Sequence, residues 1–323
     1  ELASQVSESV NTYSKYLSIR STAVYGGARI HNQRLKLKKG IDVLVATPGR
    51  LLDLHNQKSV NLNNIEILVL DEADQMLDMG FIHDIKKIVN LLPDRRQNLM
   101  FTATFSESFR SLATNMADKA IEISVTNDNE TGKNINHYIH PVDKSRKAEL
   151  LIELIKIKKW DQALVFTRTK HGADRLQKQL DKVNINSKAI HGNKTQNNRM
   201  KALEAFKNNK IQILVATDVA ARGIDIKKMS QVINFDVPTV AKDYVHRIGR
   251  TGRGGDMGEA ITLVSADEFR LLRDIEKLIN KKLERVEIEG FEPEHVVPIK
   301  DKPNKKRFHN KKGFKKRNKS RKG

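Results

Sequence analysis

Short apolar runs rich in valine, isoleucine and leucine alternate along the chain with segments of helical periodicity, which is typical of parallel sheets covered by helices. The predicted strands fall into two series. The first comprises 41–46, 65–70, 98–101 and 120–125, and the second comprises 135–142, 163–167, 187–190, 211–216, 231–235 and 259–264. Helical periodicity is present at 146–158, 172–183, 196–208 and 266–282. The pattern therefore predicts an α/β protein made of two parallel-sheet lobes.

The polar stretch 126–134 separates the two series of strands and is interpreted as an interdomain linker. The chain of 323 residues is long enough for two domains. The predicted organisation is a first lobe at 1–125, the linker at 126–134, a second lobe at 135–265, a helical extension at 266–298 and a basic tail at 299–323. The tail has too little apolar surface to offset the entropy of ordering, so we expect it to be disordered.

The charge of the chain favours a polyanionic partner. The chain has 59 basic and 39 acidic residues, a net charge of +20, which favours nucleic acid or an anionic membrane surface. Residues 299–323 hold ten lysines, three arginines and one acid, so the tail carries most of the excess. The absence of cysteine excludes disulfides and thiol-ligated metals and fits a cytoplasmic protein. No apolar run approaches the roughly 18 residues of a membrane span, so no membrane partner is expected.

Two adjacent acids, Asp71 and Glu72, follow the apolar run 65–70, with Asp74 close behind. Open α/β sheets place their ligands at the carboxyl ends of their strands. One carboxylate there can hold Mg²⁺ through its water shell while its neighbour orients or deprotonates an attacking water, as in phosphoryl transfer. An acidic helix start, capped by Asp71, explains the same residues. The local sequence leaves both interpretations open.

A second cluster of interest is His246, Arg250 and Arg253, which lie at i, i+4 and i+7 and share one face if this segment is helical. Guanidinium groups suit phosphate oxygens and neutralise the charge that develops on a transferred phosphoryl group. Gly249 and Gly252 would each cost about 1 kcal/mol in a merely solvated helix. We therefore interpret the glycines as sites of close approach and the arginines as functional.

Further candidates follow other apolar runs. In 217–225, Thr217 and the Gly223 backbone can bind phosphates and Asp225 can accept from a ribose hydroxyl, although a capped turn would look similar. Backbone N–H groups and a cation suited to a nucleic-acid backbone are offered by Gly26, Gly27, Thr47, Pro48, Gly49 and Arg50, which can also be simple turns.

Isolated polar residues complete the set. Thr102 and Thr104 end a predicted strand with hydroxyls that can bridge to the second lobe, as ordinary strand threonines also would. Arg168 and Arg199 are lone cations for which solvation is the default and phosphate contact the alternative. The histidines form no set with metal spacing, so no zinc site is predicted.

The order of these motifs is more specific than any one of them. Glu-Leu-Ala, Gly-Gly, Thr-Pro-Gly-Arg, Asp-Glu-Ala-Asp, Thr-Ala-Thr, Gln-x-x-Arg, Ala-Thr-Asp-x-Ala-Ala-Arg-Gly-x-Asp and His-Arg-Ile-Gly-Arg-Thr-Gly-Arg follow one another over 1–264. In that order they resemble the DEAD-box ATP-dependent RNA helicases. The segment 271–293 is further similar to bacterial helicases of the RhlE type.

This resemblance implies two RecA-like lobes that bind ATP, Mg²⁺ and RNA across the cleft between them. It implies that Asp71 and Glu72 serve Mg²⁺ and the hydrolytic water, that Arg250 and Arg253 reach the γ-phosphate, and that Gly223 and Asp225 lie near the nucleotide. Lobe coupling would fall to Asp74, Thr102, Thr104 and His246. The residues implied to face RNA backbone are Gly26, Gly27, Thr47, Pro48, Gly49, Arg50, Arg168, Arg199, Thr217 and Arg222.

The implied activity is ATP-driven closure that unwinds short RNA duplexes or remodels ribosomal or RNA-decay ribonucleoprotein, with the oligomeric state left open. Two features depart from the family. Thr-Ala-Thr replaces the usual Ser-Ala-Thr and keeps a hydroxyl. No G-x-x-x-x-G-K-[ST] phosphate loop is present, because the Gly132-Lys133 pair is followed by asparagine.

In the family that loop and the adenine-reading segment lie upstream of Glu-Leu-Ala. We therefore expect a fragment with an incomplete first lobe that does not hydrolyse ATP by itself. The alternative from another class is a passive RNA-binding or annealing protein held on RNA by its basic tail. A DNA helicase of the same superfamily is the alternative within the class.

Overall fold

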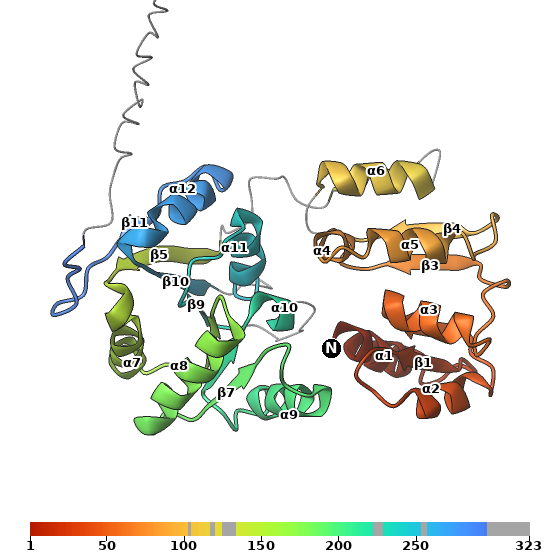
Figure 1. Cartoon of the computed structure of the whole chain (residues 1–323), viewed down its shortest axis with the longest axis horizontal. Coiled ribbons are helices and arrows are strands. Elements are labelled where there is room, and N and C mark those ends of the chain that lie inside the picture. The colour runs from red at the N-terminus through yellow and green to blue at the C-terminus, as the bar shows by residue number, and fades with distance from the viewer. Residues whose placement is uncertain (103–104, 117–119, 125–133, 222–228, 253–256, 296–323) are drawn as a thin grey trace, which may run out of the picture.

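The computed structural model describes residues 1–102, 105–116, 120–124, 134–221, 229–252 and 257–295 (Figure 1). Two groups of elements are visible, one built from the first third of the chain and one from the remainder (Figure 1). The linker expected at 126–134 falls outside the described residues except for Asn134, and the basic tail falls entirely outside them. Within the described part of the chain, no helix combines the length and apolarity that a membrane crossing needs.

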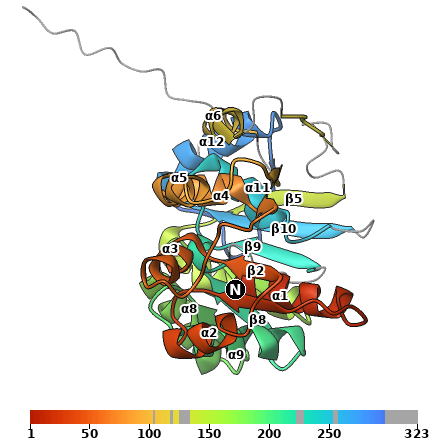
Figure 2. The same ribbon diagram turned by 90° about the vertical axis from the view of Figure 1, so that its right-hand side faces the viewer.

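The first lobe contains two separate pairs of parallel strands. Strand β1 (Ser21–Val24) pairs with β2 (Val43–Ala46), and β3 (Ile67–Leu70) pairs with β4 (Gln97–Met100). Its helices are α1 (Leu2–Tyr13), α2 (Ile30–Leu37), α3 (Pro48–Asn56), α4 (Ala73–Asp78), α5 (Ile82–Val89) and α6 (Glu107–Met116). In both views α6 lies at one end of this lobe and α2 at the other (Figures 1 and 2).

One face of the β3–β4 pair is covered and the other is open. Leu68, Leu70 and Met100 pack against a small core that includes Ile85 and Leu112. On the opposite face Ile67, Val69, Leu99 and Phe101 are exposed, because successive side chains of a strand point to opposite sides. Among the described residues, helices therefore cover only one face here, unlike the sheet covered on both faces that the apolar runs predict.

One predicted strand is absent from the described residues, and two observed strands were not predicted. Residues 120–124 form no strand, and Ile121 and Ile123 are 87% and 77% exposed, since no neighbouring strand pairs with them. Strand β1 was not predicted, because its Ser-Thr-Ala-Val run is short and half polar. Strand β11 (Glu284–Arg285) was not predicted either, and it exists only through its pairing with β5. The other predicted strands are confirmed to within two residues at each end.

The second lobe is one seven-stranded parallel sheet in the order β11-β5-β10-β9-β6-β8-β7. Its other strands are β5 (Ile135–Pro141), β6 (Ala163–Phe166), β7 (Ser187–Ile190), β8 (Ile213–Ala216), β9 (Gln231–Asn234) and β10 (Gly258–Val264). Its helices are η1 (Lys144–Arg146), α7 (Lys147–Lys158), α8 (Lys170–Lys182), α9 (Gln196–Lys207), α10 (Asp218–Ala221), α11 (Ala241–Ile248), η2 (Ala266–Glu268) and α12 (Phe269–Leu278). All described strand pairings of this sheet are parallel, so the strands end at one common edge.

Helices cover both faces of this sheet. Residues Leu151 and Leu154 of α7 join Leu176 of α8 in one core, and Phe206 of α9 lies in a second core with other strand residues. A third core joins Tyr244 of α11 to residues of α12. The segment predicted as a separate extension thus packs on the second lobe and adds β11 to the edge of its sheet.

Candidate active site

The acid cluster lies at the carboxyl end of β3, where the sequence predicts it. Asp71 is exposed, Glu72 is half-buried and Asp74 is 3% exposed. The Phe101 amide donates to the Leu70 carbonyl at 2.8 Å, and the Ala73 amide donates to the Phe101 carbonyl at 3.0 Å. These bonds tie the acids to the end of the neighbouring strand β4.

The backbone of this cluster argues against the capping interpretation of Asp71. Helix α4 begins at Ala73 with Glu72 as its N-cap and has no side-chain cap hydrogen bond. Glu72 itself has φ of 49°, in the left-handed region that a residue with a side chain seldom adopts. Such strained positions concentrate at functional sites. The Asp71 Oδ1 accepts from the Glu72 amide at 3.0 Å, which holds the two acids side by side.

A second-lobe arginine reaches this cluster. Arg250 is buried, and its Nη2 lies 4.0 Å from Oε1 of Glu72. The contact joins the end of β3 in the first lobe to the turn after α11 in the second lobe. An acid and a guanidinium that are far apart in sequence therefore face one site.

Helix α11, which precedes Arg250, is too short for the i, i+4 and i+7 positions of the motif to lie on one helix. Helix α11 ends at Ile248, with Gly249 as its C-cap, so Arg250 lies beyond the helix. His246 is half-buried in the last turn of α11. Arg253 lies outside the described residues. The prediction that the three residues share one helical face is therefore wrong for Arg250. The turn after α11 directs Arg250 to Glu72.

The glycine of this turn is required by the protein's own chain. Gly252 has φ of +68°, and a Cβ there would lie 2.6 Å from Cγ1 of Ile135 and 3.0 Å from the carbonyl oxygen of Asn134. The close approach expected from the sequence is thus made by the start of β5. Strand β5 leaves no room for any side chain at this position.

Arg247, between the predicted residues, was missed by the sequence analysis. It is fully buried and makes a bidentate ion pair with Asp218, Nε to Oδ1 at 2.5 Å and Nη2 to Oδ2 at 2.8 Å. Its Nη1 donates to Oδ1 of Asn234 at 3.1 Å and to the carbonyl of Asp236 at 2.7 Å. This arginine ties α11 to the ends of β8 and β9. Its position three residues after the apolar Tyr244, on the buried face of α11, is the signal that would have found it.

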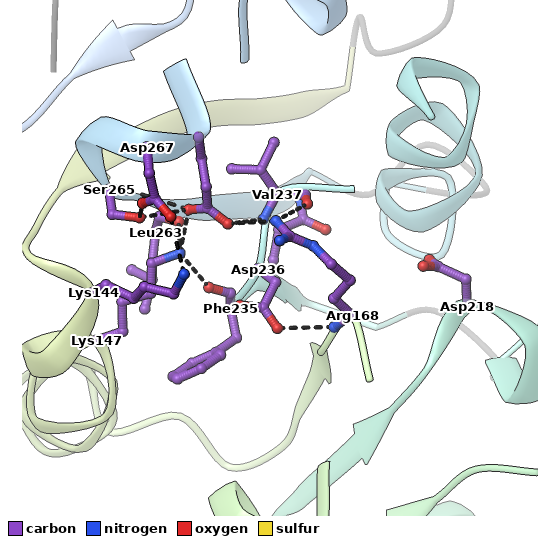
Figure 3. Close-up of polar contacts among 12 residues, drawn as sticks. Lys144, Lys147, Arg168, Asp218, Phe235, Asp236, Val237, Leu263, Ser265 and Asp267 are labelled. Atoms are coloured by element: carbon purple, nitrogen blue, oxygen red, sulfur yellow. Dashed lines mark hydrogen bonds and ion pairs between the residues drawn. The ribbon is translucent and has the colours of Figure 1, made fainter. Parts of the chain in front are cut away.

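A charged network connects the ends of neighbouring strands in the second lobe (Figure 3). Lys147 is buried, and its Nζ lies 2.5 Å from Oε2 of Glu268 and donates to the carbonyls of Phe235 and Leu263 at 2.9 and 2.8 Å. Burial lowers the pKa of Lys147, while the charge of Glu268 opposes that shift. Oε1 of Glu268 accepts from Nη2 of Arg168 at 2.8 Å. One carboxylate thus joins two cations from different elements.

Arg168, a predicted RNA contact, is held on several sides. Its amide donates to Oδ2 of Asp236 at 2.8 Å, and its Nη2 also donates to the carbonyl of Val237 at 3.1 Å. The neighbouring Thr169 caps α8 by accepting from the Gly172 amide. Arg168 is exposed, as expected for a lone cation, but it is also ion-paired with Glu268 and is therefore not merely solvated. An RNA contact by Arg168 stays a prediction.

The predicted RNA-facing residues of the first lobe lie together. Thr47 precedes α3, Pro48 opens it, and Nη1 of Arg50 donates to the Ala28 carbonyl at 3.2 Å beside the two-glycine turn. Gly27 has φ of +77°, and a Cβ there would lie 3.4 Å from Cβ of Gln196. The loops after β1 and β2 therefore form one surface that meets the start of α9.

The second lobe meets this surface through α9. Nη2 of Arg199 forms an ion pair with Oε1 of Glu1 at 2.6 Å, and both side chains are largely buried. Thr217 lies buried at the end of β8 on the same sheet edge. The half-buried Thr102 follows β4. The predicted site residues that fall outside the described part of the chain are Thr104, Arg222, Gly223, Asp225 and Arg253.

Comparison with known proteins agrees with this two-lobed fold. Residues 1–112 match the family model described as DEAD/DEAH box helicase, and residues 146–255 match the helicase conserved C-terminal domain. The chain is 41% identical over 287 residues to the DEAD-box ATP-dependent RNA helicase CshA of Bacillus cereus, a match covering 89% of this chain and 55% of CshA. The chain thus spans just over half the length of this curated relative.

Two solved structures of one yeast protein bear on the lobe arrangement. S. cerevisiae Dbp5 bound to RNA and ADP BeF3 has a TM-score of 0.80 at 32% identity, covering 89% of this chain and 75% of that one. Dbp5 L327V of S. cerevisiae, bound to gle1 H337R and IP6, has a TM-score of 0.71 at 30% identity, covering 89% and 74%. The present chain is thus more similar to the complex that contains RNA and nucleotide.

Two RecA-like parallel-sheet lobes, matched by the DEAD/DEAH box helicase model and the helicase C-terminal model, identify the class of the chain as that of RecA-like helicases. The chain belongs to the DEAD-box helicase family.

Proposed function

We propose that the protein is an ATP-dependent RNA helicase in which two lobes close on ATP and RNA and thereby separate short duplexes or remodel RNA–protein complexes. The observation that carries the proposal is the 4.0 Å approach of Arg250 to Glu72 across the two lobes. An acid cluster on one side and a guanidinium on the other suit the transfer of a phosphoryl group to water. The similarity to the Dbp5 complex with RNA and ADP BeF3 supports the same arrangement.

In this mechanism the side chains divide the chemistry of ATP hydrolysis. Glu72 orients the attacking water and accepts its proton, and Arg250 neutralises the charge that develops as the bond to the γ-phosphoryl group breaks. Asp71, an exposed carboxylate, is of the chemistry that holds Mg²⁺ through its water shell. When bound, Mg²⁺ neutralises phosphate charge. Asp74, Thr102 and His246 are proposed to couple the lobes.

RNA is proposed to bind over the surface formed by the loops after β1 and β2 and the start of α9. Gly26, Gly27 and Gly49 offer backbone N–H groups there, and Arg50 and Arg199 offer cations. These groups recognise phosphates and sugars, so sequence preference is expected to be small. Closure of the lobes changes the shape of this surface and couples nucleotide binding to RNA.

The family resemblance supports four finer parts of the proposal. These are the ribosomal or RNA-decay ribonucleoprotein substrates, the cytoplasmic location, the RhlE type, and the nucleotide roles of Gly223, Asp225 and Arg253. The sequence also contains no phosphate loop, so we propose that these 323 residues alone bind RNA without RNA-stimulated ATP turnover. Steady-state hydrolysis by residues 1–323 that RNA stimulates would contradict that proposal.

The central test is ATP hydrolysis and duplex unwinding by a protein in which a phosphate loop accompanies these residues. Glu72→Gln should lower RNA-stimulated hydrolysis by about 10²- to 10⁴-fold, since it removes the group that accepts the proton, while RNA binding persists. Arg250→Gln should lower it by about 10³- to 10⁵-fold. Arg175→Gln, an exposed arginine on α8, is the matched control and should leave the rate unchanged.

The substrates used in this assay separate the alternatives. Unwinding of a short RNA duplex that needs ATP, with little unwinding of the same DNA sequence, supports an RNA helicase. Strand annealing without any need for ATP would instead support the passive RNA-binding protein that the +20 charge also suits.

A further inference from the structure

The first lobe carries a basic surface that the proposed site does not use. Between Glu8 and Asp42 the chain has no acidic residue, but it has seven basic ones. They are Lys15, Arg20, Arg29, Arg34, Lys36, Lys38 and Lys39. All seven are exposed, and within the described part of the chain none of the four lysines has a carboxylate at ion-pair distance. Their charge is therefore available to an external anion.

The loop before β1 and the end of α2 with the loop that follows it hold these lysines and form one surface. Nη1 of Arg20 donates to the Lys39 carbonyl at 2.5 Å, and the Arg20 amide donates to Oδ2 of Asp42 at 2.8 Å. A Cβ on Gly40 would lie 3.1 Å from Nη1 of Arg20, so the second loop passes directly over that guanidinium. We name residues 13–20 and 36–40 the tyrosine–lysine surface.

Exposed aromatic rings distinguish this surface from an ordinary solvated face. Tyr13 and Tyr16 are 85% and 88% exposed, and the adjacent Leu17 is 61% exposed. Nζ of Lys15 lies 5.3 Å from the centroid of the Tyr16 ring, which places a cation at an aromatic face. Exposed rings beside a lysine are a combination that binds single-stranded nucleic acid, because bases stack on the rings while phosphates contact the cation.

The tyrosine–lysine surface is separate from the proposed RNA site. Its two loops lead into β1 and β2, whereas the two-glycine turn and the Thr47–Arg50 segment follow the same strands. Each strand has four residues, so the two surfaces are about 13 Å or more apart along the sheet. An RNA that fills the cleft between the lobes thus does not reach these tyrosines unless it extends beyond the cleft.

We propose that the tyrosine–lysine surface is a second RNA-binding site, which holds a single-stranded extension of the RNA bound between the lobes. Lys15, Lys36, Lys38 and Lys39 take phosphates, and Tyr13 and Tyr16 stack on bases. The proposal rests on the proposed function for the identity of the ligand as RNA. Its consequence is a preference for substrates with long single-stranded flanks over short oligonucleotides.

The test compares two RNA lengths by fluorescence anisotropy over a range of salt concentrations. One oligonucleotide has about ten nucleotides, within the size of a single binding groove, and the other is about four times as long. Lys36→Gln/Lys38→Gln/Lys39→Gln should lower the salt slope for the long RNA by about two, because each lysine–phosphate pair contributes about 0.7 to that slope. Tyr13→Ala/Tyr16→Ala should weaken binding of the long RNA by about fivefold or more for each base that no longer stacks.

Three controls keep the outcomes distinct. Arg175→Gln/Lys178→Gln/Lys182→Gln removes the same charge from the exposed face of α8 and should leave the long RNA almost unaffected. Binding of the short RNA should be unchanged by the lysine and tyrosine variants but weakened by Arg199→Ala. If Arg199→Ala has no effect on the short RNA, the proposed function fails independently of the second site.

Ultraviolet crosslinking provides an independent readout. Long RNA that contains 4-thiouridine should crosslink to a peptide spanning residues 13–20, and the short RNA should not. The proposal is overturned if no such crosslink forms and the lysine variants match the α8 control. It is also overturned if poly-glutamate displaces the long RNA as well as RNA itself does, because the surface would then recognise charge alone.

Discussion

At the scale of single residues, the buried pair of Lys147 and Glu268 makes the sharpest stability prediction. Glu268→Gln should lower the free energy of unfolding by about 3 kcal/mol, because it leaves a buried ammonium without its counter-charge while keeping the side-chain volume. The two side chains are 2% and 5% exposed, so water cannot take the place of the missing carboxylate. Denaturant unfolding followed by circular dichroism measures the change.

The matched control is a glutamate in an exposed pair of the same lobe. Glu149 lies 3.3 Å from Arg146, and these side chains are 64% and 40% exposed. Glu149→Gln should change stability by less than about 1 kcal/mol, because water screens the pair. Equal effects of the two substitutions would mean that the network around Glu268 contributes no more than a surface ion pair.

Substitution of two glycines with positive φ distinguishes the cost of backbone strain from the cost of a steric clash. Gly290 has φ of +80° with open space around it, whereas a Cβ on Gly252 would lie 2.6 Å from Cγ1 of Ile135. Gly290→Ala should cost about 1 to 2 kcal/mol from the left-handed backbone alone. Gly252→Ala should cost about 1 to 3 kcal/mol more, because β5 must shift. Melting temperatures of the two variants measured side by side decide this, and equal losses would contradict the steric argument.

These residues also show what a sequence can and cannot predict. Asp71 and Glu72 were predicted at a strand end, because charge that directly follows an apolar run is a local pattern. The pairing of Lys147 with Glu268 joins residues 121 positions apart, and no local pattern contains it. The Gly252 requirement likewise comes from a distant strand. Site residues that adjoin one another in sequence were predictable, whereas contacts that arise from tertiary packing were not.

At the scale of elements, burial explains which strands were predictable. Strands β6 and β8 are buried at every position and therefore consist of apolar residues without interruption. Strand β1 alternates buried and half-buried residues over only four positions, which gives a weak signal. Residues 120–124 have the apolar composition of a strand but no partner strand, and composition alone does not supply the hydrogen bonds.

Two histidines of strand β5 indicate how the stability of the second lobe depends on pH. Burial lowers the pKa of both His137 and His140 below the ordinary value of 6.5, with Lys281 adding to the effect at His137. At His140 the hydrogen bond to the Val286 carbonyl and the charge of Glu259 oppose the shift, while Lys158 adds to it. Both rings are therefore neutral in the folded lobe at pH values where the unfolded chain is already protonated.

The sign of the pH dependence follows from this difference. The unfolded chain binds more protons below pH 6.5, so stability falls as the pH drops from 6.5 toward the lowered folded pKa values. Melting temperatures measured through this window should decline, and His137→Asn/His140→Asn should decline less than the wild type. An identical decline in the double variant would assign the acid sensitivity to carboxylates instead.

At the scale of the whole molecule, the contacts between the lobes that the described residues show include two pairs of opposite charge. Arg199 pairs with Glu1, Arg250 approaches Glu72, and Gln196 lies beside Gly27. Polar contacts of this kind dissociate more readily than an apolar interface would, which suits the lobe closure that we propose. Nucleic acid that contacts both lobes adds to these contacts and favours the closed arrangement.

The basic tail makes the last prediction at this scale. Residues 299–323 carry ten lysines and three arginines against one acid, so each phosphate that they contact releases counterions when RNA binds. Removing the tail should flatten the salt dependence of RNA affinity by about 0.7 in slope for every phosphate that the tail neutralises, equally for all RNA sequences. Anisotropy titrations at several salt concentrations, with uridine-rich and mixed RNAs, measure it.

A tail whose lysines and arginines are replaced by glutamine is the matched control, because it keeps the length of the chain and removes only the charge. It should behave like the truncated protein. An unchanged slope in both variants would place the phosphate contacts on the lobes, where the cleft residues and the tyrosine–lysine surface would have to supply all of them. A change in the truncated protein alone would mean that the tail acts through something other than charge, contrary to the counterion argument.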